Sequence, residues 1–193
     1  MVAGVPHHVD GRMLSITQGA GAAVINTDRM WHYTEGVSNW APIWPKHGIR
    51  ILPGPSSLWF DARGERLEPP FMPGFDTLGT LKRILSTGHD YSWFVLSQAI
   101  IKKEFALSGS EQNPDLTSKS WMNVLKTRRG AGVPPAVEAF KQKGDDFIVR
   151  ENLADLVEAM NALAGNKLLN ADKIRTQVEA RDREIANPFS KDA

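Results

Sequence analysis

Residues 29–67 read RMWHYTEGVSNWAPIWPKHGIRILPGPSSLWFDARGERL, and this stretch holds four of the six tryptophans of the chain. Its last ten residues predict a β-hairpin in which Leu58–Phe60 lead into a turn at Asp61–Gly64 and Glu65–Leu67 lead out. Aspartate at the start of the turn and glycine at its end suit a type I turn that closes with a left-handed glycine. Such an aromatic-rich β unit needs a surface to pack on, and the rest of the sequence is mostly helical.

The composition is that of an ordinary globular chain of one domain, or of one domain with an appendage. Of the 193 residues, 41% are hydrophobic and 23% are charged, and the length suffices to bury a core. The 23 basic and 22 acidic residues form no basic tract, so no nucleic-acid partner is expected. The absence of cysteine excludes a disulfide framework, a zinc–thiolate site and a cysteine nucleophile.

Membrane and export signals are not found in the sequence. No apolar run approaches the ~18 residues that span a bilayer. Residues 1–11, MVAGVPHHVDG, lack the charged and apolar regions of a signal peptide. No membrane partner is therefore expected, and the location expected by default is cytoplasmic.

Outside the hairpin, helical periodicity dominates, and capping residues and glycines mark most of the helix ends. The apolar stretch from Tyr91 to Phe105 is expected to form the most buried helix. Further helices are expected at residues 10–21, 77–87, 116–127, 135–144, 152–163 and 171–186. Short strands are expected at residues 22–26, 30–33 and 147–149. The sequence thus predicts an α+β fold that is mostly helical, with a small sheet or hairpin.

Two motifs that suggest a site are rejected on their context. The glycines of GAGAAV, at Gly19 to Val24, follow a helix, whereas a phosphate-binding turn follows a strand and opens a helix. They are therefore interpreted as the end of a helix. His7 and His8 with Asp10 suggest a metal site and a small metal-dependent hydrolase, but adjacent side chains diverge and no second cluster has ligand spacing. No metal is therefore expected.

Two places in the sequence are candidates for acid–base chemistry. His32 lies beside Tyr33 at the expected end of a strand, and histidine suits proton transfer near neutral pH. The alternative for His32 is a structural histidine in the core or at an interface. Tyr91 follows His89 and Asp90, and this acidic residue either supports acid–base work or caps the next helix. The residues by themselves therefore show no complete catalytic constellation.

The order of motifs from Asp10 onward resembles the middle of flavoproteins of the fumarate reductase / succinate dehydrogenase / 3-ketosteroid dehydrogenase superfamily. The helix DGRMLSITQGAGA is similar to the family's DG…A…AGA helix, and WHYT at residues 31–34 is similar to its F-H-P-T strand. LWFDARGERL at residues 58–67 is similar to the hairpin that opens the substrate cap. Further stretches resemble other family segments: residues 72–81, 108–117, 152–156 and 174–189.

The resemblance implies a domain organisation and a cofactor. These flavoproteins hold the FAD pyrophosphate in a strand–GxGxxG–helix unit and end with a second flavin-contacting segment, and this sequence contains neither. The resemblance implies that residues 37–193 form a mostly helical, substrate-binding cap domain without the Rossmann FAD-binding halves. Residues 1–36 would join this cap to the flavin domain. FAD is the implied cofactor of the complete enzyme and is not expected to bind tightly to this chain alone.

The site residues that the resemblance implies are His32, Tyr33 and Tyr91. The family histidine that matches His32 lies near the flavin and helps bind the polar group of the substrate. The ketosteroid dehydrogenases use tyrosines as acid and base, and Tyr33 and Tyr91 are the two tyrosines of this chain. The fumarate reductases carry a cap arginine that protonates the substrate. The corresponding stretch, residues 91–100, has no arginine, so fumarate reduction is not expected.

The implied function is that of the substrate-cap region of an FAD-dependent dehydrogenase or reductase, which acts on C–C or C=C bonds by hydride transfer with the flavin. The isolated chain is expected to be inactive. The implied partners are a small apolar or carboxylate substrate and the missing FAD-binding halves, or a second copy through self-association. The alternative is a non-catalytic interaction domain that binds a partner chain through an exposed aromatic face.

Overall fold

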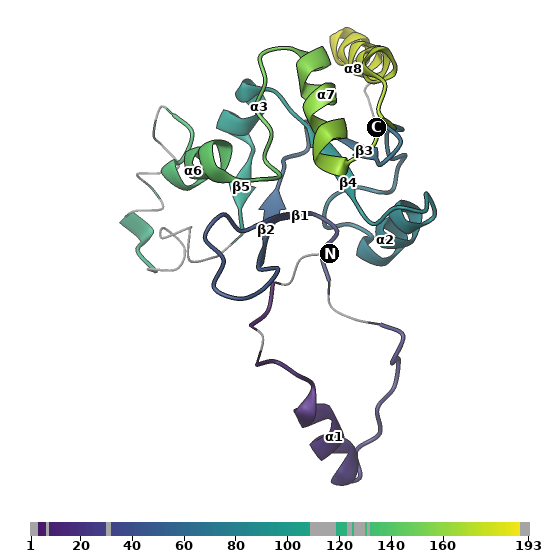
Figure 1. Cartoon of the computed structure of the whole chain (residues 1–193), viewed down its shortest axis with the longest axis vertical. Helices are drawn as coiled ribbons and strands as arrows, with labels where there is room; N and C mark the ends of the chain where they lie inside the picture. The colour runs from purple at the N-terminus through teal and green to yellow at the C-terminus, as the bar shows by residue number, and fades with distance from the viewer. Residues whose placement is uncertain are drawn as a thin grey trace.

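The computed structural model describes residues 4–6, 8–29, 32–108, 119–122, 125, 130 and 132–189. These residues form two antiparallel sheets with helices packed around them (Figure 1). The strands are β1 (Gly36–Ser38), β2 (Gly48–Leu52), β3 (Leu58–Asp61), β4 (Ser92–Val95) and β5 (Ala106–Leu107). The helices are α1 (Arg12–Gly19), α2 (Thr77–Leu85), α3 (Gln98–Lys103), α6 (Pro135–Lys143), α7 (Leu153–Ala164) and α8 (Ala171–Ala186).

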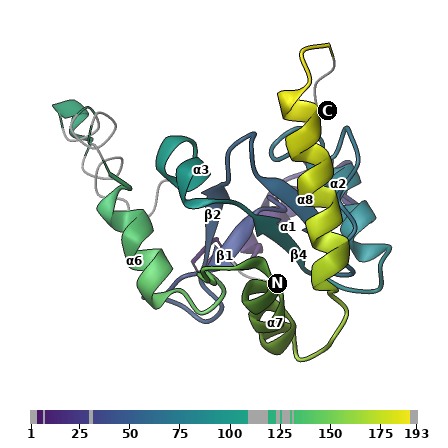
Figure 2. The same cartoon turned by 90° about the horizontal axis from the view of Figure 1, so that it is seen from above.

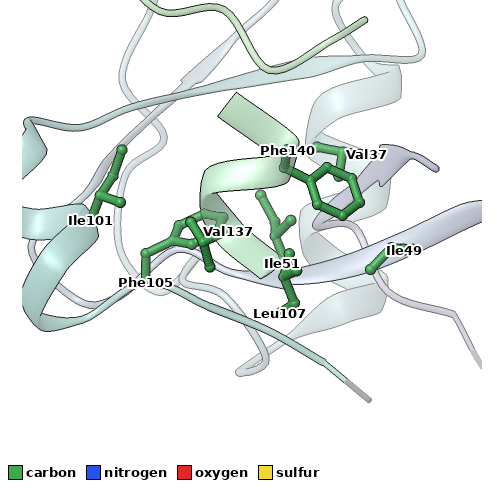
Figure 3. Packing of buried hydrophobic residues seen from close by; sticks show 8 residues of the cluster. All are labelled: Val37, Ile49, Ile51, Ile101, Phe105, Leu107, Val137 and Phe140. Carbon is green, nitrogen blue, oxygen red and sulfur yellow. The ribbon is translucent and has the colours of Figure 1, made fainter. Parts of the chain in front are cut away.

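A three-stranded sheet in the order β1–β2–β5 contributes to one apolar core. Side chains alternate between the two faces of a strand, so Ile49 and Ile51 of β2 point to the same side. There they pack with Val137 and Phe140 of α6, which are buried (Figure 3). Helix α6 therefore covers one face of this sheet, and the alternation leaves Arg50 for the opposite face.

The second sheet is a two-stranded ribbon whose two faces are covered by different helices. Strand β3 pairs with β4 so that Phe60 lies opposite Trp93. Leu58 and Phe60 pack with α7 and α8, whereas Trp59 between them packs with Ile84 of α2. Figure 2 shows α6 and α8 at opposite sides of the molecule, with strands between them. The β3–β4 ribbon therefore links the helices at the C-terminal end of the chain to α2.

The hairpin predicted after β3 is confirmed. Gly64 has a φ of 74°, and its N–H donates to the carbonyl oxygen of Asp61 at 3.1 Å. The N–H of Asp61 donates to the carbonyl oxygen of Glu65, and the N–H of Leu67 donates to that of Trp59, each at 2.8 Å. The left-handed glycine thus returns the chain alongside β3, as the D-A-R-G sequence indicated.

Helix α1 belongs to an arm, residues 8–29, that leaves the body of the protein. Figure 1 shows α1 apart from all other elements, connected to them by two long segments of chain. None of its residues is buried, and Met13, Leu14 and Ile16 are exposed. Most of the stability of a protein helix comes from packing of its apolar face. The arm therefore presents an apolar surface that the other described residues do not cover.

Helices α1, α2, α6, α7 and α8 lie where the sequence predicted them. The side chains of Asp76, Asn152 and Asn170 each accept a hydrogen bond from the backbone N–H three residues further on. These bonds satisfy N–H groups that have no partner within the helix. Gly165, in the left-handed conformation, follows the last residue of α7. Local capping chemistry thus accounts for several of the correctly predicted ends.

The prediction of one buried helix from Tyr91 to Phe105 is wrong. Ser92–Val95 forms strand β4, and only Gln98–Lys103 is helical, with Ile101 as its buried residue. A short apolar run is compatible with a strand or a helix, and pairing with β3 provides the tertiary partner that favours the strand. Because no helix begins at Tyr91, the capping role considered for Asp90 is wrong as well.

None of the three predicted short strands is found among the residues that the structure describes. Residues 22–26, 32–33 and 147–149 form no strand, and residues 30–31 lie outside the described part of the chain. The helix predicted at residues 116–127 falls largely outside the described residues, although the few that are described there are partly helical. Isolated apolar runs of three to five residues therefore lacked a neighbouring strand with which to pair.

A close approach at Gly54 leads to a prediction about stability. Gly54 has a φ of 85°, and a Cβ added there would lie 2.5 Å from Cβ of Glu104. Glu104 is held in place because its carboxylate accepts hydrogen bonds from the N–H and hydroxyl of Ser56, at 2.9 and 2.8 Å. Gly54→Ala is expected to lower the free energy of unfolding by about 2 kcal/mol more than Gly88→Ala.

Gly88 is the matched control because it has a similar φ, 81°, and an added Cβ would meet nothing within 4 Å. Both variants incur the cost of a left-handed alanine, and only Gly54→Ala adds the steric conflict. Urea unfolding followed by tryptophan fluorescence measures both free energies. Equal losses in the two variants would contradict the steric explanation.

Candidate functional site

The candidate site is built on a buried ion pair between β2 and the segment before β1. Arg50 donates from Nε and Nη2 to Oε1 of Glu35, at 3.0 and 2.8 Å. The Glu35 side chain is 0% exposed and the Arg50 side chain is 25% exposed. The other carboxylate oxygen, Oε2, accepts from the N–H and the hydroxyl of Thr34, each at 3.1 Å. The buried carboxylate is therefore both paired and hydrogen-bonded, as its burial requires.

Tyr33 rests on the guanidinium group of this pair. The Cζ atom of Arg50 lies 3.8 Å from the centroid of the Tyr33 ring, which is a cation–π contact. Tyr33 is 45% exposed, so a surface side chain contacts a group that is anchored to the fully buried Glu35. The ion pair therefore restricts the orientation of an exposed tyrosine.

His32 is held by helix α2. Its Nε2 atom lies 3.1 Å from the carbonyl oxygen of Thr77, the first residue of the helix. A carbonyl oxygen can only accept, so Nε2 carries the proton in this contact. His32 and Tyr33 are neighbours in the sequence, and each is fixed by a different element, α2 for the histidine and β2 for the tyrosine.

Apolar side chains lie in the segment that leads into α2. Gly74 approaches the ion pair closely, because a Cβ added there would lie 3.3 Å from Nη2 of Arg50. On either side of this glycine, Met72 and Phe75 are exposed. We call residues 72–75 the apolar rim. The rim contacts Arg50 at Gly74 and is followed closely by Thr77, so it borders the groups that hold both Tyr33 and His32.

The third predicted residue, Tyr91, has a different set of neighbours. Its hydroxyl oxygen accepts a hydrogen bond from Nδ2 of Asn166, at 2.8 Å, in the connection between α7 and α8. Its ring centroid lies 5.6 Å from that of His89 and 5.5 Å from that of Trp93. These contacts tie Tyr91 to the α7–α8 connection, whereas His32 and Tyr33 are held by α2 and β2.

Sequence reasoning missed Glu35 and Arg50. A signal for Arg50 exists in the segment GIRIL, where Ile49 and Ile51 flank the charged residue with the period of a strand. That pattern indicates a strand with one apolar face and an arginine on the other. Glu35 has no comparable signal, because nothing local connects it with a residue fifteen positions further along the chain.

The described residues of the metal cluster considered near the N-terminus, His8 and Asp10, are not arranged as metal ligands. Asp10 forms an ion pair with Arg12, with 2.6 Å between Oδ2 and Nε. His8 is exposed, and His7 lies outside the described residues. Within the described ranges, no group of three or more histidine, aspartate or glutamate side chains is placed to hold a metal ion. No metal ligands are therefore assigned.

Comparison with known proteins identifies the family. The sequence model described as "FAD binding domain" matches residues 1–193, the whole chain. The chain belongs to this FAD-binding family. It is 59% identical to a KsdD-like steroid dehydrogenase of Mycobacterium tuberculosis (strain CDC 1551 / Oshkosh) and 57% identical to one of Mycolicibacterium smegmatis (strain ATCC 700084 / mc(2)155), over 192 residues in each case.

These alignments cover 100% of the chain but only 34% and 35% of the length of the two relatives. The chain thus spans about a third of the length of the curated relatives it matches. No solved structure matches it significantly. The family confirms the resemblance to FAD-binding dehydrogenases that the motif order suggested. It also confirms FAD as the cofactor of the complete protein.

The described residues of this FAD-binding family member do not form a dinucleotide-binding turn. Helix α1 ends at Gly19, and Gly21, with a φ of 90°, follows it. These glycines end a helix, as the sequence suggested, instead of opening one after a strand. All strand pairs in the described ranges are antiparallel. Among the described residues, the glycines at the end of α1 therefore do not form a phosphate-binding turn.

A hollow of ≈ 590 Å³ lies between α7 and the start of α8. Asn161, Asn166 and Asp172 are among its lining residues, and the apolar rim is not. Asn166 is also the partner of the Tyr91 hydroxyl. The hollow is therefore close to Tyr91 and is not built by the residues that hold His32 and Tyr33.

No helix among the described residues combines the length and the apolar character needed to cross a membrane. The cytoplasmic location stays a prediction from the sequence.

Proposed function

We propose that residues 37–193 form the substrate cap of an FAD-dependent dehydrogenase or reductase, and that residues 1–36 join the cap to the flavin-binding part. The complete protein is proposed to act on C–C or C=C bonds of an apolar, steroid-like substrate by hydride transfer with FAD. The observation that carries this proposal is the location of His32 and Tyr33. Two side chains suited to proton transfer are fixed where the exposed arm returns to the body of the protein.

The arm supports the assignment of residues 1–36 as a connection. Its helix exposes Met13, Leu14 and Ile16, and full burial of such a side chain contributes about 2 kcal/mol. The chain covers 34% of the Mycobacterium tuberculosis relative, so a protein of that kind has further segments available. We infer that the arm packs on the flavin-binding part of the complete protein, and that β1, which begins at Gly36, is the first element of the cap.

The apolar rim supports an apolar substrate with a polar group. Met72 and Phe75 expose apolar surface beside the residues that hold His32 and Tyr33. Binding sites for small molecules typically combine mostly apolar lining with a few placed polar groups. A steroid with a ring carbonyl has this distribution of polarity, and the relatives carry the name steroid dehydrogenase. A carboxylate substrate is less well matched, because the rim adds no cation and Arg50 is already paired with Glu35.

The two neighbouring residues are assigned different roles in this proposal. The Tyr33 hydroxyl exchanges a proton with the substrate, since its ring is exposed and fixed on Arg50. His32 is assigned a place beside the polar group of the substrate, and its Nε2–H, which is donated to Thr77, orients the ring and is not counted as a donor to the substrate. Tyr91 is proposed as a second acid–base tyrosine, because the bond it accepts from Asn166 leaves its own proton free to be donated. FAD, when bound by the complete protein, supplies the hydride exchange.

Flavin retention tests the assignment of this chain as a cap. After the purified chain is mixed with FAD and desalted, no flavin absorption band is expected, because the residues that the structure describes contain no dinucleotide-type turn to hold the pyrophosphate. The complete protein treated in the same way is the control and is expected to keep the band. A stable band on the 193-residue chain would show that it builds a flavin site of its own, and the cap assignment would then be wrong.

The alternative function, a non-catalytic interaction domain, predicts a single exposed aromatic face. The most exposed aromatic side chains of the described residues are Phe75, Trp121 and Phe189, and they come from separate segments of the chain. The exposed apolar residues of the arm are aliphatic. No observation therefore favours the interaction domain over the cap.

A further inference from the structure

We propose that Arg50 is a positioning residue that acts through Tyr33. The proposal deepens the proposed function and rests on it, because Tyr33 is there assigned to proton exchange with the substrate. Arg50 does not touch the substrate in this proposal. It holds the tyrosine ring in the orientation that presents the hydroxyl.

The geometry of the guanidinium group supports this role. The Nε and Nη2 atoms on one edge of the group both donate to Oε1 of Glu35, at 3.0 and 2.8 Å. The Tyr33 ring lies over Cζ at 3.8 Å. The guanidinium group is planar, so its edge binds the carboxylate while its face contacts the aromatic ring. The position of the tyrosine thus follows from a carboxylate that is buried in the body of the protein.

The surroundings of Arg50 limit its own freedom. Arg50 binds Oε1 of Glu35, and the second carboxylate oxygen, Oε2, already accepts two hydrogen bonds from Thr34. Gly74 lies close to the same edge of the guanidinium group, because a Cβ added there would lie 3.3 Å from Nη2. Arg50 is therefore held by the core carboxylate, and the apolar rim lies close to it at Gly74. Because the guanidinium group under the Tyr33 ring is held in place, fewer orientations are open to this exposed side chain.

A fixed hydroxyl matters for the proposed reaction. Proton transfer depends on the distance and direction between the donor and the reacting atom, and a misplacement of about 1 Å lowers a rate by as much as about 100-fold. A tyrosine that is 45% exposed would otherwise sample several rotamers. Arg50→Lys keeps the positive charge for Glu35 and removes the planar face and the paired donors. This substitution therefore isolates the positioning effect from the charge.

Fluorine NMR of the 193-residue chain labelled with 3-fluorotyrosine tests the contact directly. The chain has two tyrosines, so two signals arise, and Tyr91→Phe assigns them. In Arg50→Lys the Tyr33 signal is expected to move toward the chemical shift of free 3-fluorotyrosine, while the Tyr91 signal stays in place. Glu35→Gln, which removes the charge that anchors Arg50, is the second variant and is expected to move the same signal in the same direction.

The Tyr91 signal is the internal control for a general loss of structure. If both signals move together, Arg50 has only a structural role and the inference is wrong. The inference is also overturned if the Tyr33 signal stays unchanged in Arg50→Lys. Neither result depends on turnover, so this measurement decides whether Arg50 holds Tyr33 independently of the proposed reaction.

Kinetics of the complete protein test the consequence for the reaction. With androst-4-ene-3,17-dione as the probe substrate and a dye as the electron acceptor, Arg50→Lys is expected to lower kcat about tenfold and to change KM less. Tyr33→Phe keeps a ring on Arg50 and removes the hydroxyl, so adding Arg50→Lys to it is expected to lower kcat no further.

The outcomes separate the two proposals. If the losses from Arg50→Lys and Tyr33→Phe multiply, Arg50 does not act through the hydroxyl of Tyr33 and the inference fails. If the complete protein does not turn the probe over, or if Tyr33→Phe retains full kcat, the proposed function fails instead. In that case the fluorine signals still show whether Arg50 fixes the ring.

Discussion

Arg50→Met is expected to lower the free energy of unfolding by about 4 kcal/mol, because it leaves a buried carboxylate without its counter-charge. Glu35 is fully buried, and in the variant the described residues would compensate its charge with the two hydrogen bonds from Thr34 alone. Methionine fills a similar volume, so the loss reports the charge and not a cavity. Urea unfolding followed by tryptophan fluorescence measures the change.

The matched control is the double variant Arg50→Met, Glu35→Leu. Replacing both members of a buried pair with apolar residues removes the uncompensated charge, and such replacements are often neutral. The double variant is expected to recover at least half of the stability lost in Arg50→Met. If the single variant loses less than about 1 kcal/mol, water reaches Glu35 and the pair does not anchor Tyr33 as described.

Local signals in the sequence predicted a large part of the fold. The D-A-R-G turn after β3 and the caps Asp76, Asn152 and Asn170 depend on hydrogen bonds within a few residues of each other. Such features are encoded where they occur. The turn signal predicted the hairpin and Asn152 predicted the start of α7, whereas apolar periodicity predicted α2 and α8.

Features that depend on distant partners were not predictable in the same way. Residues 92–95 form a strand because residues 58–61 pair with them, and their apolar composition suits a buried helix equally well. The sequence therefore led to a helix there. Conversely, the two-residue alternation of GIRIL is a local signal for a strand with one apolar face, and this segment forms β2.

The candidate site also combines features that the local sequence indicates with contacts that only the tertiary structure provides. The adjacency of His32 and Tyr33 is a property of the sequence; histidine chemistry made His32 a candidate, and the family resemblance added Tyr33. Their fixation is a property of the fold, because the contacts with Thr77 and Arg50 span 45 and 17 positions. A single sequence contains no local signal for contacts at such separations.

Asp61→Ala is expected to lower the free energy of unfolding by about 4 kcal/mol, since this carboxylate organises the turn of the hairpin. The residue is 2% exposed. Its Oδ1 accepts from the N–H groups of Arg63 and Glu65, at 2.8 and 3.0 Å, and its Oδ2 is paired with Nη1 of Arg83 in α2, at 3.2 Å. Alanine removes all three interactions and leaves two N–H groups of the turn without their acceptor.

Two controls divide this loss into its parts. Asp61→Asn keeps an oxygen for the N–H groups of Arg63 and Glu65 and loses the charge, so it is expected to cost about half as much as Asp61→Ala. Glu68→Ala removes the other carboxylate of Arg83, which lies 3.4 Å from Nε and is largely exposed, and is expected to cost less than about 0.5 kcal/mol. Equal losses in the alanine and asparagine variants would assign the stability to the ion pair with α2. The hydrogen bonds that shape the turn would then contribute nothing measurable.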